Sequence, residues 1–409
     1  MGVSHSLIKQ PYNSIAYRIL VMLLWTQYTV LNLVRAVIER LPYIGLLAEI
    51  FIPVCIIIAA MASLPWLLRH IRGIDVLLYV GMVLTVLLTM VIFPQNREYL
   101  EDEWYRILIF TASVYFIGVS FSARVCSTDL FWCSLVGVVS MLLYRLYQIN
   151  SGATLENDDM DAAYKLLPSV MYLVYYASCK KRKIYWGVAI SSAIVLFIFG
   201  TRGPIICVSI YLLVLVILKV LGSKHSVKTI FYILIFACFI AILFDEDLFI
   251  GIAGKAARIF DRIGFSTRIF DYFLAGNVLE SRGREILLQQ TIDAILANPI
   301  VGYGFTGDRY LLGIYTHNIV FEIWCHFGIV LGTFILIAII ALTVLALIKS
   351  WSHEKTFKFV VMLICMVFIK LMLSGSYVTE TYFYFMIGVF VAVLRKGYTR
   401  RRVVIEREI

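Results

Sequence analysis

Charged residues are scarce in this sequence. Only 15% of its 409 residues are Asp, Glu, Lys or Arg, whereas an ordinary soluble domain carries about 25%. Hydrophobic residues make up 61%, in apolar runs of about 17 to 25 residues, each long enough to cross a bilayer as a helix. These runs leave no stretch for a soluble domain of normal size. The composition predicts an all-α, polytopic integral membrane protein that forms one domain over residues 1–409.

Paired cysteines are also missing. The eight cysteines stand singly, with no C-x-x-C pair, so neither disulfides nor zinc sites are expected. The first residues lack a short apolar core followed by a cleavage site, and we therefore expect no removable signal peptide. A basic stripe with interleaved aromatics is absent as well. The net charge of +10 is therefore assigned to cytoplasmic loops and lipid headgroups, and nucleic acid is not expected as a partner.

Basic residues gather in alternate connections between the apolar runs, for example at 69–72, 180–183 and 395–402. The positive-inside rule places these connections and both termini in the cytoplasm. The intervening connections, including the acidic residues 95–103 and the long polar segment 245–316, then face outward. About twelve spans are predicted, with starts near Tyr17, Ile44, Ile74, Tyr105, Asp129, Tyr164, Ile184, Gly203, Thr229, Asn318, Phe357 and Tyr377.

The long extracytoplasmic loop, residues 245–316, contains nine acidic and seven basic residues and is therefore not a general basic patch. Within it, Ser281 precedes residues 284–297, where apolar side chains recur at helical spacing, and Asn298 with Pro299 ends the run. This pattern predicts an amphipathic helix that lies on the membrane surface.

Arginines at two outward positions are suited to a phosphate. Arg202, in GTRGP, stands on a tight turn between two spans, where its planar side chain could bind a lipid-linked phosphate or simply anchor in headgroups. Arg282 and Arg284, in SRGR, open the predicted surface helix, where free N–H groups also favour an anion. Arg268 is a third candidate, although Asp271, one turn away, could pair with it.

His317 and Asn318 begin the tenth predicted span. The positive end of a helix dipole disfavours protonation of an imidazole at the helix N-terminus, and a neutral histidine is a usable general base near pH 7. A histidine at a span end can equally be an interfacial residue.

Glu322, His326 and Lys370 are ionisable residues within predicted spans. Glu322 and His326 are spaced i to i+4 and share a helical face, where each lowers the cost of burying the other. Lys370 also needs a partner, for which Glu380 and the Glu322 pair are candidates.

Residues 302–307, GYGFTG, match G-x-G-x-x-G but follow a predicted surface helix rather than a strand, which argues against nucleotide binding. Gly302, Tyr303 and Gly304 are instead expected to let a polar loop fold close to the membrane or to a sugar. The acidic residues Glu156, Asp158, Asp159 and Asp161 could hold a divalent ion, but such runs are mostly solvated loops, and no metal site is predicted.

The order of these motifs resembles the O-antigen ligase and polymerase family, which includes Wzy-type polymerases and WaaL-type ligases. GTRGP at a span start, SRGR with a helix, NPIVGYG, and His317–Asn318 followed by Gly328 appear in sequence, so the resemblance covers residues 200–332. In one departure, His326 stands where many members carry an acidic residue two positions before the glycine, and the acid here is Glu322.

The resemblance implies a GT-C type, inverting, metal-independent glycosyltransferase without a cofactor. Its donor and acceptor would be glycans on undecaprenyl diphosphate, used outside the bacterial inner membrane. Arg202, Arg284 and His317 match the family's catalytic positions. The predicted substrate-binding residues are Arg282, Arg268, Asn318, Tyr303, Gly302, Gly304 and Glu322.

A polymerase that extends O-antigen or capsular polysaccharide is the first hypothesis, with membrane lipids, a chain-length regulator and a flippase as possible partners. A ligase that transfers finished glycan to lipid A core is the nearest alternative. A transporter of lipid-linked sugars comes from a different class, and it should show ionisable groups or broken helices near mid-membrane in repeated halves.

Overall fold

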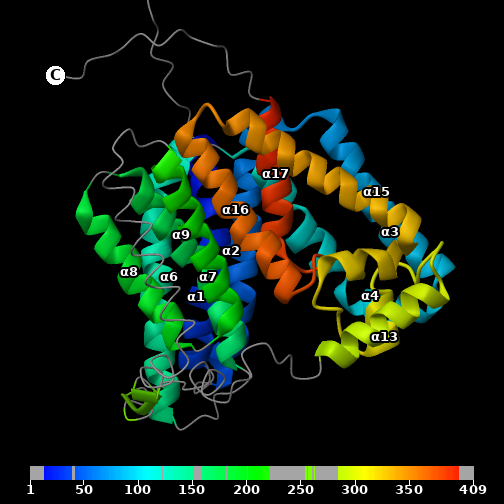
Figure 1. Ribbon diagram of the computed structural model, residues 1–409, viewed down its shortest axis with the longest axis horizontal. Helices are drawn as coiled ribbons and strands as arrows, with labels where there is room; N and C mark the ends of the chain where they lie inside the picture. The colour runs from blue at the N-terminus through cyan, green and yellow to red at the C-terminus, as the bar shows by residue number, and fades with distance from the viewer. Residues whose placement is uncertain are drawn as a thin grey trace, which may run out of the picture.

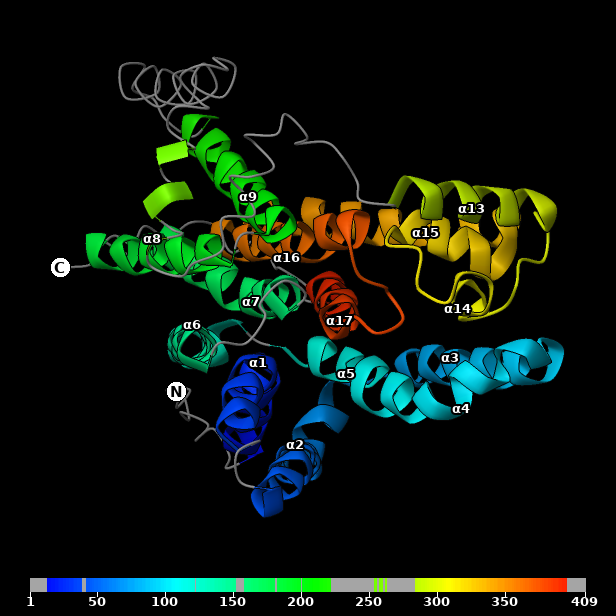
Figure 2. The same ribbon diagram turned by 90° about the horizontal axis from the view of Figure 1, so that it is seen from below.

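The computed structural model describes residues 13–38, 42–121, 123–151, 158–180, 182–199, 201–221, 254–255, 257–259, 262 and 284–395. All the regular elements in these ranges are helical, as Figure 1 and Figure 2 show from two directions. They are α1 (Asn13–Ile38), α2 (Pro42–His70), α3 (Gly73–Ile92), η1 (Pro94–Asn96), α4 (Arg97–Tyr105), η2 (Arg106–Ala112), α5 (Val114–Val119), α6 (Ala123–Ser151), α7 (Asp158–Cys179), α8 (Lys183–Ile198), α9 (Arg202–Leu221), α13 (Arg284–Ala297), α14 (Gly307–Leu312), α15 (Ile319–Ser350), α16 (Glu354–Leu373) and α17 (Thr381–Arg395).

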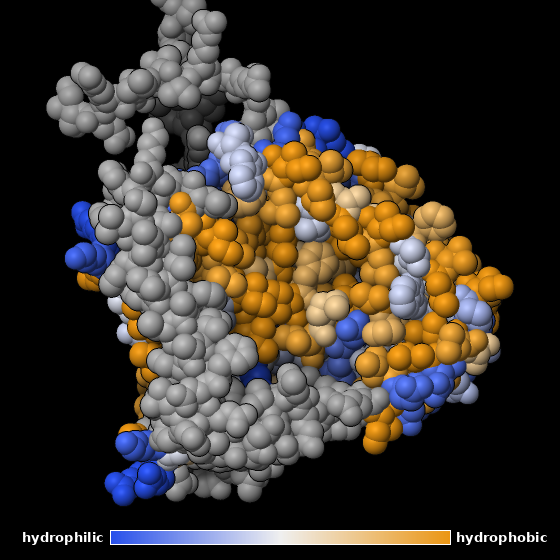
Figure 3. All heavy atoms as spheres, viewed as in Figure 1, coloured by the Kyte–Doolittle hydropathy of each residue, from blue (hydrophilic) through white to orange (hydrophobic). Residues whose placement is uncertain are grey.

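The surface of this helical bundle is largely apolar. Large hydrophobic side chains such as Met61, Val91 and Phe334 are 66–74% exposed. Figure 3 shows apolar residues across the middle of the visible face and hydrophilic residues toward its top and bottom. Within the described ranges, five helical segments are long and apolar enough to cross a membrane, and they lie in α3, α6, α9, α15 and α16. The chain is therefore a helical membrane protein.

The predicted spans fall on helices, apart from the ninth, near Thr229, which lies outside the described residues. The total of twelve stays a prediction. One predicted span and one predicted start are wrong in detail. The fourth span is not one α-helix, because it is divided into α4, the π-helical η2 and α5. The twelfth helix begins at Thr381 rather than Tyr377, because residues 374–380 form a loop that is bonded to distant groups.

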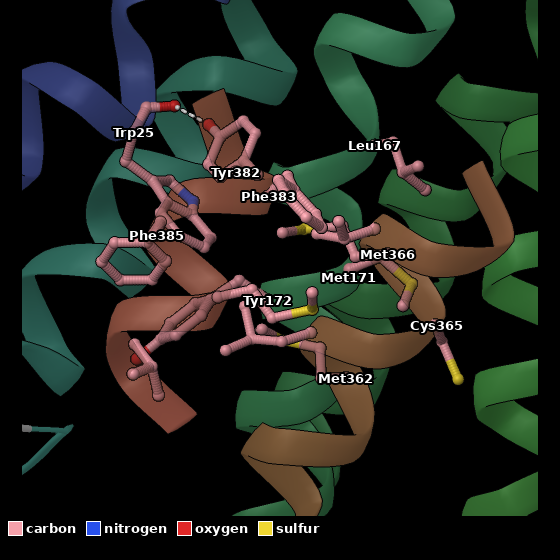
Figure 4. Packing of buried hydrophobic residues seen from close by; sticks show 14 of the residues in the cluster. Trp25, Leu167, Met171, Tyr172, Met362, Cys365, Met366, Tyr382, Phe383 and Phe385 are labelled. Carbon is pink, nitrogen blue, oxygen red and sulfur yellow. Dashed lines mark hydrogen bonds between the residues drawn. The ribbon is translucent and has the colours of Figure 1, made fainter. Parts of the chain in front are cut away.

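Aromatic and sulfur-containing side chains fill the centre of the bundle. The Trp25 ring of α1 meets Tyr172 of α7 and Tyr382 of α17 edge to face, with centroids 5.6 and 5.4 Å apart (Figure 4). Helices α5 and α17 pack at Gly118 and Gly388, where an added Cβ would lie 2.2–2.3 Å from the partner's backbone. Small residues thus allow the close helix contact that is common in membranes.

Side-chain bonds define two ends of the bundle. At one end, both guanidinium nitrogens of Arg395 donate to the buried carboxylate of Asp75, at 2.6 and 2.7 Å, which joins the end of α17 to the start of α3. At the other end of α3, Asn96 donates to the carbonyls of Tyr303 and Phe305 at 2.7 and 3.3 Å. At each end, the two connections that are joined were predicted to share a membrane face, and they do lie together. Which face of the membrane each end occupies stays a prediction.

Candidate functional site

A break in α15 organises the region around the sequence motifs. Gly328 has φ +72° and ψ 170°, so the helix stops and restarts there, and Figure 1 shows α15 bending near its first turns. Helical bonding is lost at such a break, and backbone groups become available to another segment. The predicted continuous span from Asn318 is therefore a short helical segment followed by a longer one.

Residues 299–304 dock into this break. The N–H groups of Tyr303 and Gly304 donate to the carbonyls of Cys325 and His326, each at 2.9 Å, and Ile329 N–H donates to Pro299 at 2.6 Å. A Cβ on Gly302, at φ +71°, would lie 2.5 Å from the nitrogen of Gly328.

Gly304 is equally confined, because its Cβ would lie 2.5 Å from the Phe93 ring. The hydroxyl of Tyr303 donates to the Ala294 carbonyl of α13 at 3.1 Å. Gly302 thus permits close packing on α15, and Gly304 permits close packing on Phe93. The predicted substrate contacts of Gly302, Tyr303 and Gly304 stay predictions.

Beyond the docked loop, α14 contributes a buried ion pair to the short first segment of α15. Arg309 Nη1 lies 2.6 Å from Asp308 Oδ1 and 3.0 Å from Glu322 Oε1. His326 Nε2 lies 2.8 Å from Asp308 Oδ1. Asp308 and Glu322 have fully buried side chains, and that of Arg309 is 15% exposed. Glu322 and His326 share a face as predicted, and they are joined through Asp308 and Arg309.

The loop between α16 and α17 closes this buried polar cluster, which consists of Asp308, Arg309, Glu322, His326, Ser376 and Tyr377. Arg309 Nη2 donates to the Ser376 hydroxyl at 2.5 Å, and that hydroxyl donates to Glu322. The Tyr377 N–H donates to Glu322 Oε2 at 3.1 Å, and its hydroxyl bonds His326 Nδ1 at 2.8 Å. Both Glu322 oxygens are therefore engaged within the protein, and a contact of Glu322 with substrate stays a prediction.

Opposite charges in the buried polar cluster compensate one another. Burial by itself raises the pKa of the Asp308 carboxyl, but His326 and the Arg309 guanidinium outweigh burial and hold this pKa below its usual range. The carboxylates of Asp308 and Glu322 raise the pKa of Arg309 further, against the effect of its own burial. Asp308 and Arg309 are thus held as an ion pair, which lowers the cost of burying both.

Ligand atoms of Asp308, Glu322 and His326 lie within 4.8 Å of one another, a spacing that a metal ion could use. The Oδ1 of Asp308 and the Oε1 of Glu322 accept from Arg309 Nη1. The guanidinium thus occupies the position between the two carboxylates where a cation would bind. At the acidic cluster considered from the sequence, Asp161 pairs with Lys165 at 2.5 Å, and Glu156 lies outside the described residues.

His317 stands immediately before α15 in a left-handed backbone conformation, with φ +60°. Asn318 caps the helix, because its side-chain oxygen accepts from the N–H groups of Val320 and Phe321, at 3.0 and 3.5 Å. The Asn318 amide also donates to the Met372 carbonyl of α16 at 3.4 Å. The predicted helix start is confirmed, and His317 is half-buried.

Arg202 is the first residue of α9, as predicted for a turn between two spans. A Cβ on the next residue, Gly203, would lie 1.9 Å from the hydroxyl of Tyr164, and Lys370 lies over the Tyr164 ring at 5.3 Å. Lys370 pairs with Glu380, one of its two predicted partners. The GTRGP turn is thus packed beside the end of α16, which Asn318 also contacts.

Arg284 is the first residue of α13, and the predicted limits of this helix, 284–297, are confirmed. Thr291 and Ile295 are buried, whereas Ile286 and Leu296 are 66% and 65% exposed. These exposed apolar side chains are consistent with a helix on the membrane surface. Leu296 lies in the predicted apolar run, but it is not buried with Thr291 and Ile295. Arg268 and Arg282 lie outside the described residues.

Asp308, Arg309, Ser376 and Tyr377 were missed by sequence reasoning. A weak signal for the first two exists, since an adjacent acid and base follow directly after a glycine-rich loop in an apolar chain. Ser376 and Tyr377 gave no signal, because the residues fell at the start of a predicted span.

Residues 186–337 match the profile of the Wzy_C family, described as O-antigen ligase, over less than half of the chain. The matched region contains Arg202, Arg284, the buried polar residues of α14 and α15, and His317. No curated protein and no solved structure matches the chain.

Proposed function

We propose that this chain, a member of the O-antigen ligase/polymerase family by its residues 186–337, is a membrane polysaccharide polymerase that extends O-antigen or capsular glycan. The family itself indicates a ligase or polymerase type of function, glycosyltransferase-like chemistry and lipid-linked glycan substrates. In the proposal, donor and acceptor are glycans on undecaprenyl diphosphate, and the site faces outward from the bacterial inner membrane. Both termini are then cytoplasmic.

One observation carries the proposal. Arg202 and Arg284 are each the first residue of a helix, and His317 directly precedes the N-cap of a third. Free N–H groups and the positive end of the helix dipole favour an anion at each of these helix starts. This placement supports the proposed roles of Arg202 and Arg284 at a diphosphate leaving group and of His317 as the base.

The proposed reaction begins when His317 takes the proton from an acceptor hydroxyl. The hydroxyl oxygen attacks the anomeric carbon of the donor, and the bond from that carbon to the diphosphate oxygen breaks. The diphosphate leaves with the electron pair, and Arg202 and Arg284, assisted by Arg282 and Arg268, neutralise its charge. A single displacement of this kind inverts the anomeric carbon and needs neither a metal nor a cofactor.

Alanine variants of Arg284 and His317 test the proposal in a strain that lacks the chromosomal copy. Both variants should insert normally and abolish chain extension, so that the ladder of surface glycan lengths collapses to single repeats. Arg69→Ala and His353→Ala are matched controls, because both residues are exposed and stand in connections predicted to be cytoplasmic, opposite the proposed site. A normal ladder in both R284A and H317A would refute the proposed roles.

A ligase remains the second candidate, because the matching family is described as O-antigen ligase. The deletion strain separates the two activities. Single-repeat surface glycan without a ladder indicates a polymerase, whereas long glycan stranded on undecaprenyl diphosphate indicates a ligase.

A transporter of lipid-linked sugars is distinguished with purified protein. Detergent-solubilised protein has no second compartment, so transport alone cannot lengthen a glycan. Formation of a longer glycan from lipid-linked repeats therefore supports a transferase. If folded protein leaves the length of the lipid-linked repeats unchanged, transport is supported instead.

A further inference from the structure

The backbone around His317 is held by α14 on one side and by α16 on the other. The Thr316 N–H and hydroxyl both donate to Asp308 Oδ2, at 3.1 and 3.3 Å. On the other side of His317, Asn318 caps α15 and donates to Met372. His317 therefore lies between two anchored neighbours, in a left-handed conformation that costs about 1 to 3 kcal/mol outside glycine.

An aromatic ring supports the imidazole itself. The centroids of the Tyr315 and His317 rings lie 4.2 Å apart, with 53° between the ring planes. The Arg309 guanidinium lies 5.8 Å from the centroid of the same Tyr315 ring, within the range of a cation–π contact. Because Arg309 is fixed by Asp308, Glu322 and Ser376, the ring is connected to the buried polar cluster.

We propose that Tyr315 and Thr316 are positioning residues for His317, with the Asp308–Arg309 pair as their rigid support. Thr316 fixes the backbone before His317 through Asp308, and the Tyr315 ring restricts the orientation of the imidazole. This inference rests on the proposed function, because it assigns His317 the role of base.

The physical reason is the geometry of proton transfer. A general base must stand within about 3 Å of the hydroxyl that it deprotonates. A histidine one residue outside a helix would otherwise sample several rotamers, and only some of these would meet the acceptor. Rings in contact at 4.2 Å remove part of that freedom before substrate binds.

Purified full-length protein and lipid-linked repeats provide the test. Tyr315→Leu removes the ring, whereas Tyr315→Phe keeps it. We expect kcat of Y315L to fall by about 10- to 100-fold with KM unchanged, because a displaced base slows chemistry without weakening donor binding. Y315F should behave as the parent protein. The matched control is Tyr105→Leu, which removes a tyrosine that is 47% exposed.

A double variant separates positioning from general support of the fold. Purified H317A, which cannot form a ladder in cells, is followed over a long incubation to measure its residual rate. If Tyr315 acts through His317, adding Y315L to H317A should not reduce that residual rate further. A further loss in the double variant, or a loss in Y315F equal to that in Y315L, overturns the inference. If Y315L does not yield folded protein, Thr316→Val replaces it, with Thr316→Ser as the variant expected to restore kcat. An unchanged kcat in T316V then overturns the inference.

The same experiment distinguishes this inference from the proposed function. If H317A extends glycan as well as the parent protein, the base role of His317 in the proposed function is wrong. If H317A is inactive while Y315L keeps the parent kcat, only the positioning roles are wrong.

Discussion

Replacing Gly328 by alanine tests the docking of residues 299–304 on the break in α15. An alanine Cβ there would lie 2.2 Å from the carbonyl oxygen of Ile300 and 2.5 Å from its carbonyl carbon. Both are backbone atoms, which cannot rotate away. The φ of +72° and ψ of 170° also belong to a region reserved for glycine, at a cost of about 1 to 3 kcal/mol for other residues. The docked segment must therefore move, or α15 must straighten.

Either movement breaks the backbone bonds donated by Tyr303, Gly304 and Ile329, whose net value is about 1 kcal/mol each. With the conformational strain, the free energy of unfolding should fall by about 4 to 6 kcal/mol. With an unfolding entropy of about 2.1 cal/mol/K per residue, the corresponding decrease in Tm for a chain of 409 residues is about 5 to 7 °C.

Thermal unfolding in detergent, followed by tryptophan fluorescence, measures this decrease. Gly81→Ala is the matched control, because Gly81 lies in α3 with nothing within 4 Å of an added Cβ. Alanine inside a helix is favoured over glycine by about 0.5 to 1 kcal/mol, so the control should not lose stability. A parental Tm for G328A, or an equal decrease in G81A, would refute the docking argument.

Two further variants test buried charges in the same thermal assay. Arg309→Met leaves the carboxylates of Asp308 and Glu322 buried without their guanidinium, and the free energy of unfolding should fall by about 3 to 5 kcal/mol. The control, Arg97→Met, removes an exposed ion pair worth about 1 kcal/mol or less. Equal Tm values for the two variants would contradict the expectation. Asp75→Asn leaves the Arg395 guanidinium without its counter-charge, and the free energy of unfolding should fall by about 3 to 5 kcal/mol. Adding Arg395→Gln should recover part of this stability. Strictly additive losses in the double variant would refute the pairing.

Helix limits near the site could be predicted because their signals are local. Asn298 and Pro299 end α13, and Asn318 caps α15 through bonds to N–H groups two and three residues ahead. Such stop and cap signals act within one turn of the chain, so they can be recognised without knowledge of the tertiary structure.

The break at Gly328 was hidden by the same local reasoning. Residues 319–350 read as one apolar helix of 32 residues, although about 20 suffice to cross the membrane. The surplus length, with a glycine inside it, was the available signal. What makes the break necessary is the docked loop, and the partners of that contact are separated in sequence by more than twenty residues.

The buried polar cluster could not be predicted for a related reason. Arg309 binds Glu322, 13 residues away, and Ser376, 67 residues away. Charge alone suggested partners for Lys370, and one of them was confirmed, because a cation in an apolar helix requires an anion. For Arg309, which falls in a polar loop, composition gave no reason to expect burial.

The spacing from His317 to Gly328 has a physical explanation in this arrangement. The first segment of α15 is bounded by the Asn318 cap at one end and by the docking site of residues 299–304 at the other. The docked chain continues into α14, whose Asp308 returns to bind Thr316 at the first end. Both ends of one short helix thus contact the same loop, so the length of that helix is restricted. One inserted residue would rotate the two ends by about 100° relative to each other, and the loop could no longer reach both.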